Sequence, residues 1–123
     1  MKDIARFFGV LSDETRLEML WLLFNQREIC VCDFIGALEI TQSKASRHLS
    51  TMRHAGLVLD RREGTWSYYS LKSVEGELKQ ALLKALRSKL AGHTRAFELL
   101  GRLHECIECR SRPAQAATKG RTR

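Results

Sequence analysis

Apolar residues recur every three or four positions along most of the chain, the spacing that is typical of amphipathic helices. Ser12-Asp13-Glu14 and Thr41 have side chains that begin helices, and Gly56 suits the end of one. The pattern predicts helices over residues of about 3–11, 14–25, 29–38, 42–54, 75–90 and 93–110.

Between the fourth and fifth helices the hydrophobic period changes to about two. Leu57-Val58-Leu59 leads into charged residues, Glu63-Gly64 marks a turn, and residues 65–71 are rich in strand formers. This segment is expected to be a β-hairpin. The predicted fold class is therefore mostly α with a small β-hairpin: a winged helix-turn-helix, which is a DNA-reading unit.

The pattern divides the chain into three parts. Residues 1–92 are expected to form the winged helix-turn-helix domain for DNA binding and dimerisation. Residues 93–110 are expected to form a C-terminal helix with a pair of cysteines. Residues 111–123 include Pro113, are basic and contain no acidic residue, which predicts a disordered tail.

Charge is distributed unevenly within the overall net charge of +7. Residues 41–62 contain five basic residues and one acidic residue, which gives +4, whereas residues 1–40 contain four basic and seven acidic residues, which gives −3. A local positive patch of this kind points to a polyanionic partner.

The helix over 42–54 would bury Ala45, Leu49 and Met52 and turn its other face to a DNA groove. Gln can pair with adenine, Arg or Lys with guanine, and Ser can hold phosphates. These residues could also form a merely solvated face, but the adjoining hairpin and the local charge favour DNA binding. The candidate DNA-binding residues are Gln42, Ser43, Lys44, Ser46, Arg47 and His48, with Arg61 and Arg62 at the hairpin tip.

The four cysteines come as two pairs, Cys30-Val31-Cys32 and Cys106-Ile107-Glu108-Cys109. The start of the chain lacks the pattern of a signal peptide, and no run of 18 apolar residues exists, so a cytoplasmic protein without a membrane segment is expected. In a reducing cytosol, cysteines act as thiols or as ligands rather than as disulfides. Thiolates select soft ions such as trivalent arsenic, Cu(I), cadmium or lead.

Helix geometry separates the two pairs. In a regular helix Cys30 and Cys32 point about 200° apart and cannot share one ion, although at an extended helix start they can converge. Binding to both is therefore expected to conflict with helical geometry at the start of the third helix, and so to distort the support of the DNA-reading helix after it. Cys106 and Cys109 are about 300° apart, hence on one face. Trivalent arsenic takes three sulfurs, so the third could come from Cys106 or Cys109 of either subunit, or from a small thiol.

Simpler interpretations of the cysteines stay open. Buried cysteine is common as a small apolar residue, and the pair near the tail could be incidental. A closed Cys₄ zinc site would need both pairs to meet, and one intervening residue in the first pair is shorter than is usual for zinc.

Several stretches resemble the arsenic- and metal-responsive winged-helix repressors of the ArsR/SmtB family. The resemblance covers about residues 4–90, and its pieces are 11–17, 28–34, 42–49, 55–58 and the wing 59–69. Cys30-Val31-Cys32-Asp33 matches the motif of the arsenic and cadmium/lead branches, and the wing looks most like the arsenic branch.

This resemblance implies a homodimer joined by the first and the long C-terminal helices. It implies that Cys30 and Cys32 bind the inducer, As(III) or Sb(III), and that binding releases operator DNA. The expected function is repression of an arsenical-resistance operon, with no enzymatic activity and no required cofactor.

The chain departs from the family pattern in three places. Position 35 holds isoleucine where some arsenic repressors carry a third cysteine. Zinc sensors of the family use positions that here hold Ser73, Glu75, Leu86 and Lys89. Cadmium/lead sensors add N-terminal cysteines, and none precedes Cys30.

Three other functions remain as alternatives. A cadmium- or lead-responsive repressor and a thiol-redox-responsive repressor would share this fold and differ in the trigger. A small thiol enzyme or metallochaperone would leave the helix and wing without a purpose.

Overall fold

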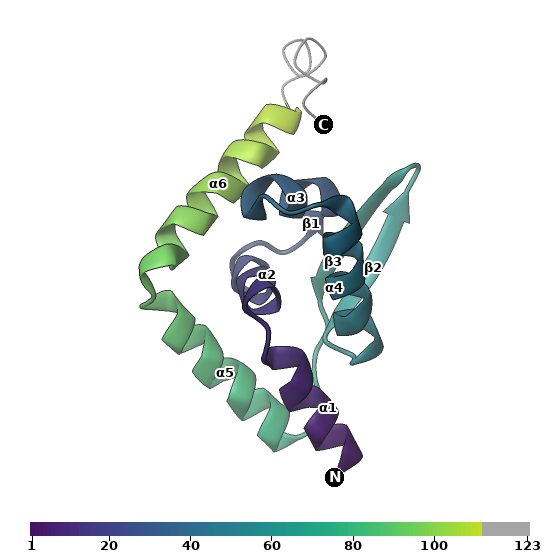
Figure 1. Ribbon diagram of the computed structural model, residues 1–123, viewed down its shortest axis with the longest axis vertical. Helices are drawn as coiled ribbons and strands as arrows, with labels where there is room; N and C mark the ends of the chain where they lie inside the picture. Colours follow the sequence, from purple (N-terminus) through teal and green to yellow (C-terminus); the bar gives the residue numbers. More distant parts are fainter. Residues whose placement is uncertain (112–123) are drawn as a thin grey trace.

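The computed structural model describes residues 1–111 (Figure 1). Most of the expected basic tail, residues 112–123, lies outside the described residues. The elements in chain order are α1 (Lys2–Leu11), α2 (Glu14–Asn25), β1 (Ile29–Cys30), α3 (Val31–Leu38), α4 (Gln42–His54), β2 (Val58–Glu63), β3 (Trp66–Leu71), α5 (Glu77–Ala91) and α6 (Thr94–Ser111). None of the helices within residues 1–111 is long and apolar enough to cross a membrane.

Helix α2 lies at the centre of the fold. It begins where the sequence predicts, because the Asp13 carboxylate accepts a hydrogen bond from the backbone N–H of Arg16 at 3.1 Å. Its consecutive residues 19–23 are all buried, since α1 and α3 to α6 all contact this helix. Such a helix is apolar on several sides rather than along one stripe.

Helices α3 and α4 form the helix-turn-helix. The turn takes residues 39–41, and Glu39 has a left-handed backbone (φ 56°) that ends α3. Thr41 caps α4 by accepting a hydrogen bond from the backbone N–H of Lys44 at 3.1 Å. Gly56 follows α4 with φ 79°, as expected of a glycine beyond a helix end. The predicted bounds of α4 are thus confirmed.

The expected hairpin of β2 and β3 is present, but the sheet has three strands rather than two. Ile29 and Cys30, expected to be helical, form the short strand β1, and the strand order is β1-β3-β2. All pairs are antiparallel, with Cys30 opposite Tyr68 and Arg61 opposite Tyr68 on the other side of β3. The prediction of a helix over 29–38 is therefore wrong for its first two residues, because pairing with β3 holds them extended.

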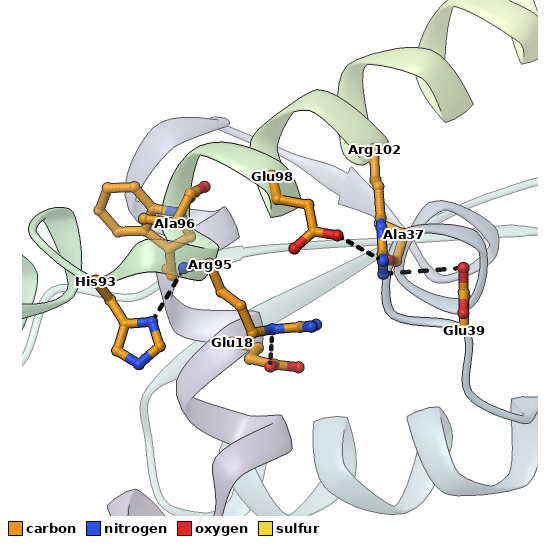
Figure 2. Close-up of polar contacts among 9 residues, drawn as sticks. Glu18, Ala37, Glu39, His93, Arg95, Ala96, Glu98 and Arg102 are labelled. Atoms are coloured by element: carbon orange, nitrogen blue, oxygen red, sulfur yellow. Dashed lines mark hydrogen bonds and ion pairs between the residues drawn. The ribbon is translucent and has the colours of Figure 1, made fainter.

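Gly92 separates α5 from α6, as the sequence predicts. Helix α6 then runs back along α2 and α3 (Figure 1). Its inner face buries Ala96, Leu99 and Leu103. Figure 2 shows the polar contacts at this junction, where Arg95 binds Glu18 at 3.1 Å. Helix α6 therefore shares the hydrophobic core of the preceding helices.

Candidate functional site

The thiols of Cys30 and Cys32 lie side by side where β1 meets α3. Cys30 precedes the helix with extended backbone (φ −71°, ψ 145°), and Cys32 lies in the first turn. The two Sγ atoms are 2.8 Å apart. The two sulfurs thus converge at an extended helix start, the one arrangement in which the sequence allows them to share an ion. The 200° rule applies to two helical residues, and Cys30 is held outside the helix by its pairing with Tyr68.

The Cys32 thiol donates its hydrogen bond to Cys30. Burial, together with this bond and the nearby Asp33 carboxylate, raises the pKa of Cys32 to about 12. At neutral pH Cys32 is therefore a thiol rather than a thiolate. A ligand that binds this sulfur must provide a destination for its proton.

An ion pair that the sequence did not predict adjoins the two thiols. Asp33 is fully buried in α3, and its carboxylate accepts a 2.7 Å hydrogen bond from Nη2 of Arg110 on α6. The Arg110 guanidinium also lies 5.9 Å from the ring centroid of Trp66, at the start of β3. Arg110 thus connects α3, α6 and the wing.

All four cysteines line one open pocket of about 820 Å³. The pocket lies between α3, α4, the wing and α6, and its aromatic lining comes from Trp66 and Tyr69. Gln42 and Ser46 of α4 are part of the same wall. Within residues 1–111, no group of three or more His, Cys, Asp or Glu side chains is already placed to hold a metal ion. The pocket therefore brings both pairs into one space without assembling a closed site such as Cys₄ zinc.

Most of the candidate DNA-binding residues lie on the exposed face of α4. Ala45, Leu49 and Met52 are buried as predicted. Gln42, Ser43, Ser46 and Arg47 are exposed, and Lys44 is partly exposed. The N-terminal half of α4 thus presents hydrogen-bonding side chains and two cations at the positive end of the helix dipole.

His48 differs from these residues, because it turns toward the protein. Its side chain is 13% exposed, its Nδ1 lies 3.0 Å from Nη1 of Arg16, and its Nε2 lies 3.8 Å from the Asp13 carboxylate. Burial lowers the pKa of His48 below its usual 6.5, although Asp13 opposes this shift. The structure thus places His48 against the N-terminus of α2, on the inner side of α4.

The position of His48 predicts a pH dependence of stability. The unfolded chain takes up a proton near pH 6.5, while the folded chain resists it, so acidification favours unfolding. We expect the free energy of unfolding to rise between pH 5 and pH 7, with a contribution from His48 of at most about 1.4 kcal/mol per pH unit. Urea titrations at several pH values give the free energy of unfolding at each pH. For His48→Gln, this free energy should rise less steeply with pH than it does for the unsubstituted chain. An unchanged slope would mean that His48 is not the group responsible.

The two arginines of the wing have different surroundings. Arg61 lies within β2 rather than in the turn, and its guanidinium binds Glu28 at 2.8 Å and Glu63 at 2.7 Å. Arg62 also lies within β2, opposite Ser67, rather than in the turn, and it lines the pocket that holds the four cysteines. Two carboxylates thus offset the charge of Arg61, and the turn itself is formed by Gly64 and Thr65.

Comparison with known proteins supports the assignment of the fold and the family. Residues 13–59 match the family described as "Bacterial regulatory protein, arsR family". The chain is 43% identical over 79 residues to the arsenic resistance transcriptional regulator ArsR1 of Pseudomonas putida. It is 48% identical over 66 residues to the arsenical resistance operon repressor of Escherichia coli, and 40% identical over 94 residues to that of Bacillus subtilis.

Coverage of these relatives varies. The matches take in 64%, 54% and 75% of this chain. They span 62% of the Pseudomonas protein and 56% of the Escherichia protein, but 90% of the Bacillus repressor. The likeness to the Bacillus repressor therefore extends over nearly that whole protein.

Solved structures show the same architecture. HlyU from Vibrio cholerae superposes with a TM-score of 0.61 at 29% identity, over 71% of this chain and 90% of that protein. The homodimeric winged helix-turn-helix domain of Mb0332 from Mycobacterium bovis gives 0.60 at 30% identity, over 76% and 83%. Together with the Bacillus match, these likenesses establish that the chain belongs to the ArsR family of bacterial regulatory proteins.

Proposed function

We propose that the chain is a DNA-binding transcriptional repressor of an arsenic-resistance operon, released from its operator when trivalent arsenic or antimony binds Cys30 and Cys32. The observation that carries this proposal is the 2.8 Å contact between the two sulfurs in a pocket shared with α4. The names of the relatives from Pseudomonas, Escherichia and Bacillus support arsenic as the inducing element.

The thiol pair fits a thiophilic ion with a small adjustment. Two sulfurs that each lie about 2.3 Å from one ion are about 3.5 Å from each other. The observed separation of 2.8 Å would have to open by less than 1 Å. Arsenous acid also removes the thiol protons, because each proton leaves with an arsenic hydroxyl as water while an As–S bond replaces an As–O bond. Arsenic stays trivalent throughout.

DNA binding is assigned to α4 and the wing. Gln42, Ser43, Lys44, Ser46 and Arg47 would enter the major groove, with Arg62 beside the backbone. His48 and Arg61 would act through protein contacts, since both are engaged with charged neighbours. Gln42 and Ser46 also line the pocket that holds the four cysteines. An ion bound in this pocket would therefore alter the packing around these two DNA-binding side chains.

The DNA-bound form is proposed to be a cytoplasmic homodimer, formed by residues 1–92. Helices α1 and α5 leave large apolar side chains at the surface: Ile4 (39% exposed), Phe8 (49%) and Leu78 (47%). Helix α5 has no fully buried residue, although leucines recur along it. An apolar surface of this kind needs a partner, and the Mb0332 domain, which has the same fold, is a homodimer.

Operator release measures this function directly. The full chain, bound to fluorescently labelled operator, is titrated with arsenite, cadmium, lead and zinc, and separately with peroxide. We expect arsenite to release DNA at the lowest concentration. Cys30→Ser and Cys32→Ser should bind operator within a few-fold of the unsubstituted chain, but require on the order of 100-fold more arsenite for release.

Each arm of this titration has a distinct meaning. Normal release of the Cys30→Ser/Cys32→Ser double variant by arsenite would rule out the thiol pair as the sensor. Release by cadmium or lead before arsenite would assign the chain to a cadmium- or lead-responsive function. Release by peroxide alone would assign a redox trigger.

A further inference from the structure

Helix α6 is fastened to α3 by two arginines, one near each end of α3. Arg102 donates a 3.3 Å hydrogen bond to the carbonyl of Ala37, at the C-terminal end of α3 (Figure 2). Arg110 binds Asp33, at the N-terminal end. The two helices are therefore antiparallel. Residues 102, 106 and 110 are four apart and lie on one side of α6, so Cys106 is directed at the middle of α3.

The missing side chain of Gly36 makes room for this cysteine. A Cβ atom at position 36 would lie 2.7 Å from the Sγ of Cys106, closer than such atoms approach in proteins. Gly36 follows Cys32 by four residues, so both are on the same face of α3, one turn apart. The Cys106 sulfur therefore lies about one helical turn from Cys32, and both open on the same pocket.

We propose that Cys106 of the same chain supplies the third sulfur for the metalloid, which completes a three-sulfur site across the contact of α3 and α6. This inference rests on the proposed arsenite-responsive function and names a ligand that the motif Cys30-Val31-Cys32 lacks. The third thiol gives its proton to the last arsenic hydroxyl, which leaves as water. Arsenic then holds three sulfurs and no oxygen.

Formation of this site requires motion of α6 rather than unwinding of α3. Rotation of the Cys106 side chain about its Cα–Cβ bond moves the sulfur by about 3 Å, less than one helical turn. The remaining distance has to be covered by a shift of α6 toward the start of α3. Such a shift pulls on Arg110, which contacts both Asp33 and the ring of Trp66 in the wing. Binding of the ion would thereby displace Arg110 and change its contact with Trp66 in the wing.

The number of protected thiols tests the proposal without reference to DNA. The full chain is reduced with a phosphine, freed of small thiols and mixed with one equivalent of arsenite. It is then alkylated, and its mass is measured by mass spectrometry, which counts the thiols that arsenite protected from alkylation. We expect three protected thiols in the unsubstituted chain and two in Cys106→Ser. Arsenite should bind Cys106→Ser on the order of 10- to 100-fold more weakly than the unsubstituted chain. The near-ultraviolet absorbance of arsenic–thiolate bonds measures this binding. Cys109→Ser should keep three protected thiols.

A second pair of variants leaves all four cysteines in place. Gly36→Ala puts a methyl group 2.7 Å from the present position of the Cys106 sulfur, so the sulfur has to move, and arsenite binding should weaken about tenfold. Gly101→Ala is the matched control on α6, since a Cβ there meets no atom within 4 Å. It should bind arsenite as the unsubstituted chain does.

The possible results separate this inference from the proposed function. Three protected thiols in Cys106→Ser together with two in Cys109→Ser would overturn the choice of Cys106. Two protected thiols in the unsubstituted chain would show that no third protein sulfur takes part. In both cases Cys30 and Cys32 keep their role. If arsenite protects neither of them, the proposed function itself fails.

Discussion

Replacement of Arg47 by alanine should weaken operator binding by a factor of about 30 to about 3 × 10⁴. Arg47 lies on the exposed face of α4, opposite the buried Ala45, Leu49 and Met52. An arginine that contacts a base or phosphate contributes about 1–3 kcal/mol, and a dimer loses two of them, about 2–6 kcal/mol. Fluorescence anisotropy with labelled operator at several salt concentrations measures this loss. If Arg47 contacts phosphates, the plot of log affinity against log salt concentration should become less steep by about 1.8, since each of the two lost contacts contributes about 0.9.

The matched control is Arg95→Ala. It removes the same charge from the start of α6, on the opposite side of the molecule from α4 (Figure 1). Arg95 binds Glu18 on the surface, a contact that contributes less than about 1 kcal/mol to stability. Operator affinity should be almost unchanged in this variant. Equal losses in both variants would mean that net charge, rather than the face of α4, determines DNA binding.

The sequence predicts those elements whose signals are local. Helix α4 has a cap at Thr41, a glycine at its end and apolar residues at helical spacing, so its bounds follow from neighbouring residues. Strand β1 has only two residues and exists because Ile29 and Cys30 pair with Tyr69 and Tyr68, some 40 residues away in the chain. Helical periodicity continues across these two residues, so the sequence pattern alone favours a helix there.

The same distinction applies to the candidate site. The cysteine pairs and the polar face of α4 are evident from spacing. The convergence of Cys30 and Cys32 depends on β1, and the pairing of Asp33 with Arg110 joins residues 77 apart. The sequence does contain one indication of the contact between α6 and α3. Arg102, Cys106 and Arg110 repeat at four-residue intervals, which places them on one face of the last helix. Their partners on α3 could not be deduced without the packing of α6.

Replacement of Arg110 by alanine should reduce the free energy of unfolding by about 3–5 kcal/mol. Asp33 is fully buried, and its carboxylate would remain in the interior without the guanidinium that now binds it at 2.7 Å. An unpaired buried charge costs several kcal/mol because water no longer solvates it. Urea or thermal unfolding of the full chain measures this loss.

A double-mutant cycle distinguishes the ion pair from simple packing. Asp33→Ala alone should also be destabilising, since Arg110 is only 26% exposed and would lose its partner. The Asp33→Ala/Arg110→Ala variant should be more stable than the sum of the two losses predicts, because no uncompensated charge remains. Purely additive losses would mean that Arg110 stabilises the chain through its contact with Trp66 instead. A non-additive result would show that the Asp33–Arg110 ion pair holds α6 against α3 beside the cysteines. Movement of α6 would then have to weaken this ion pair.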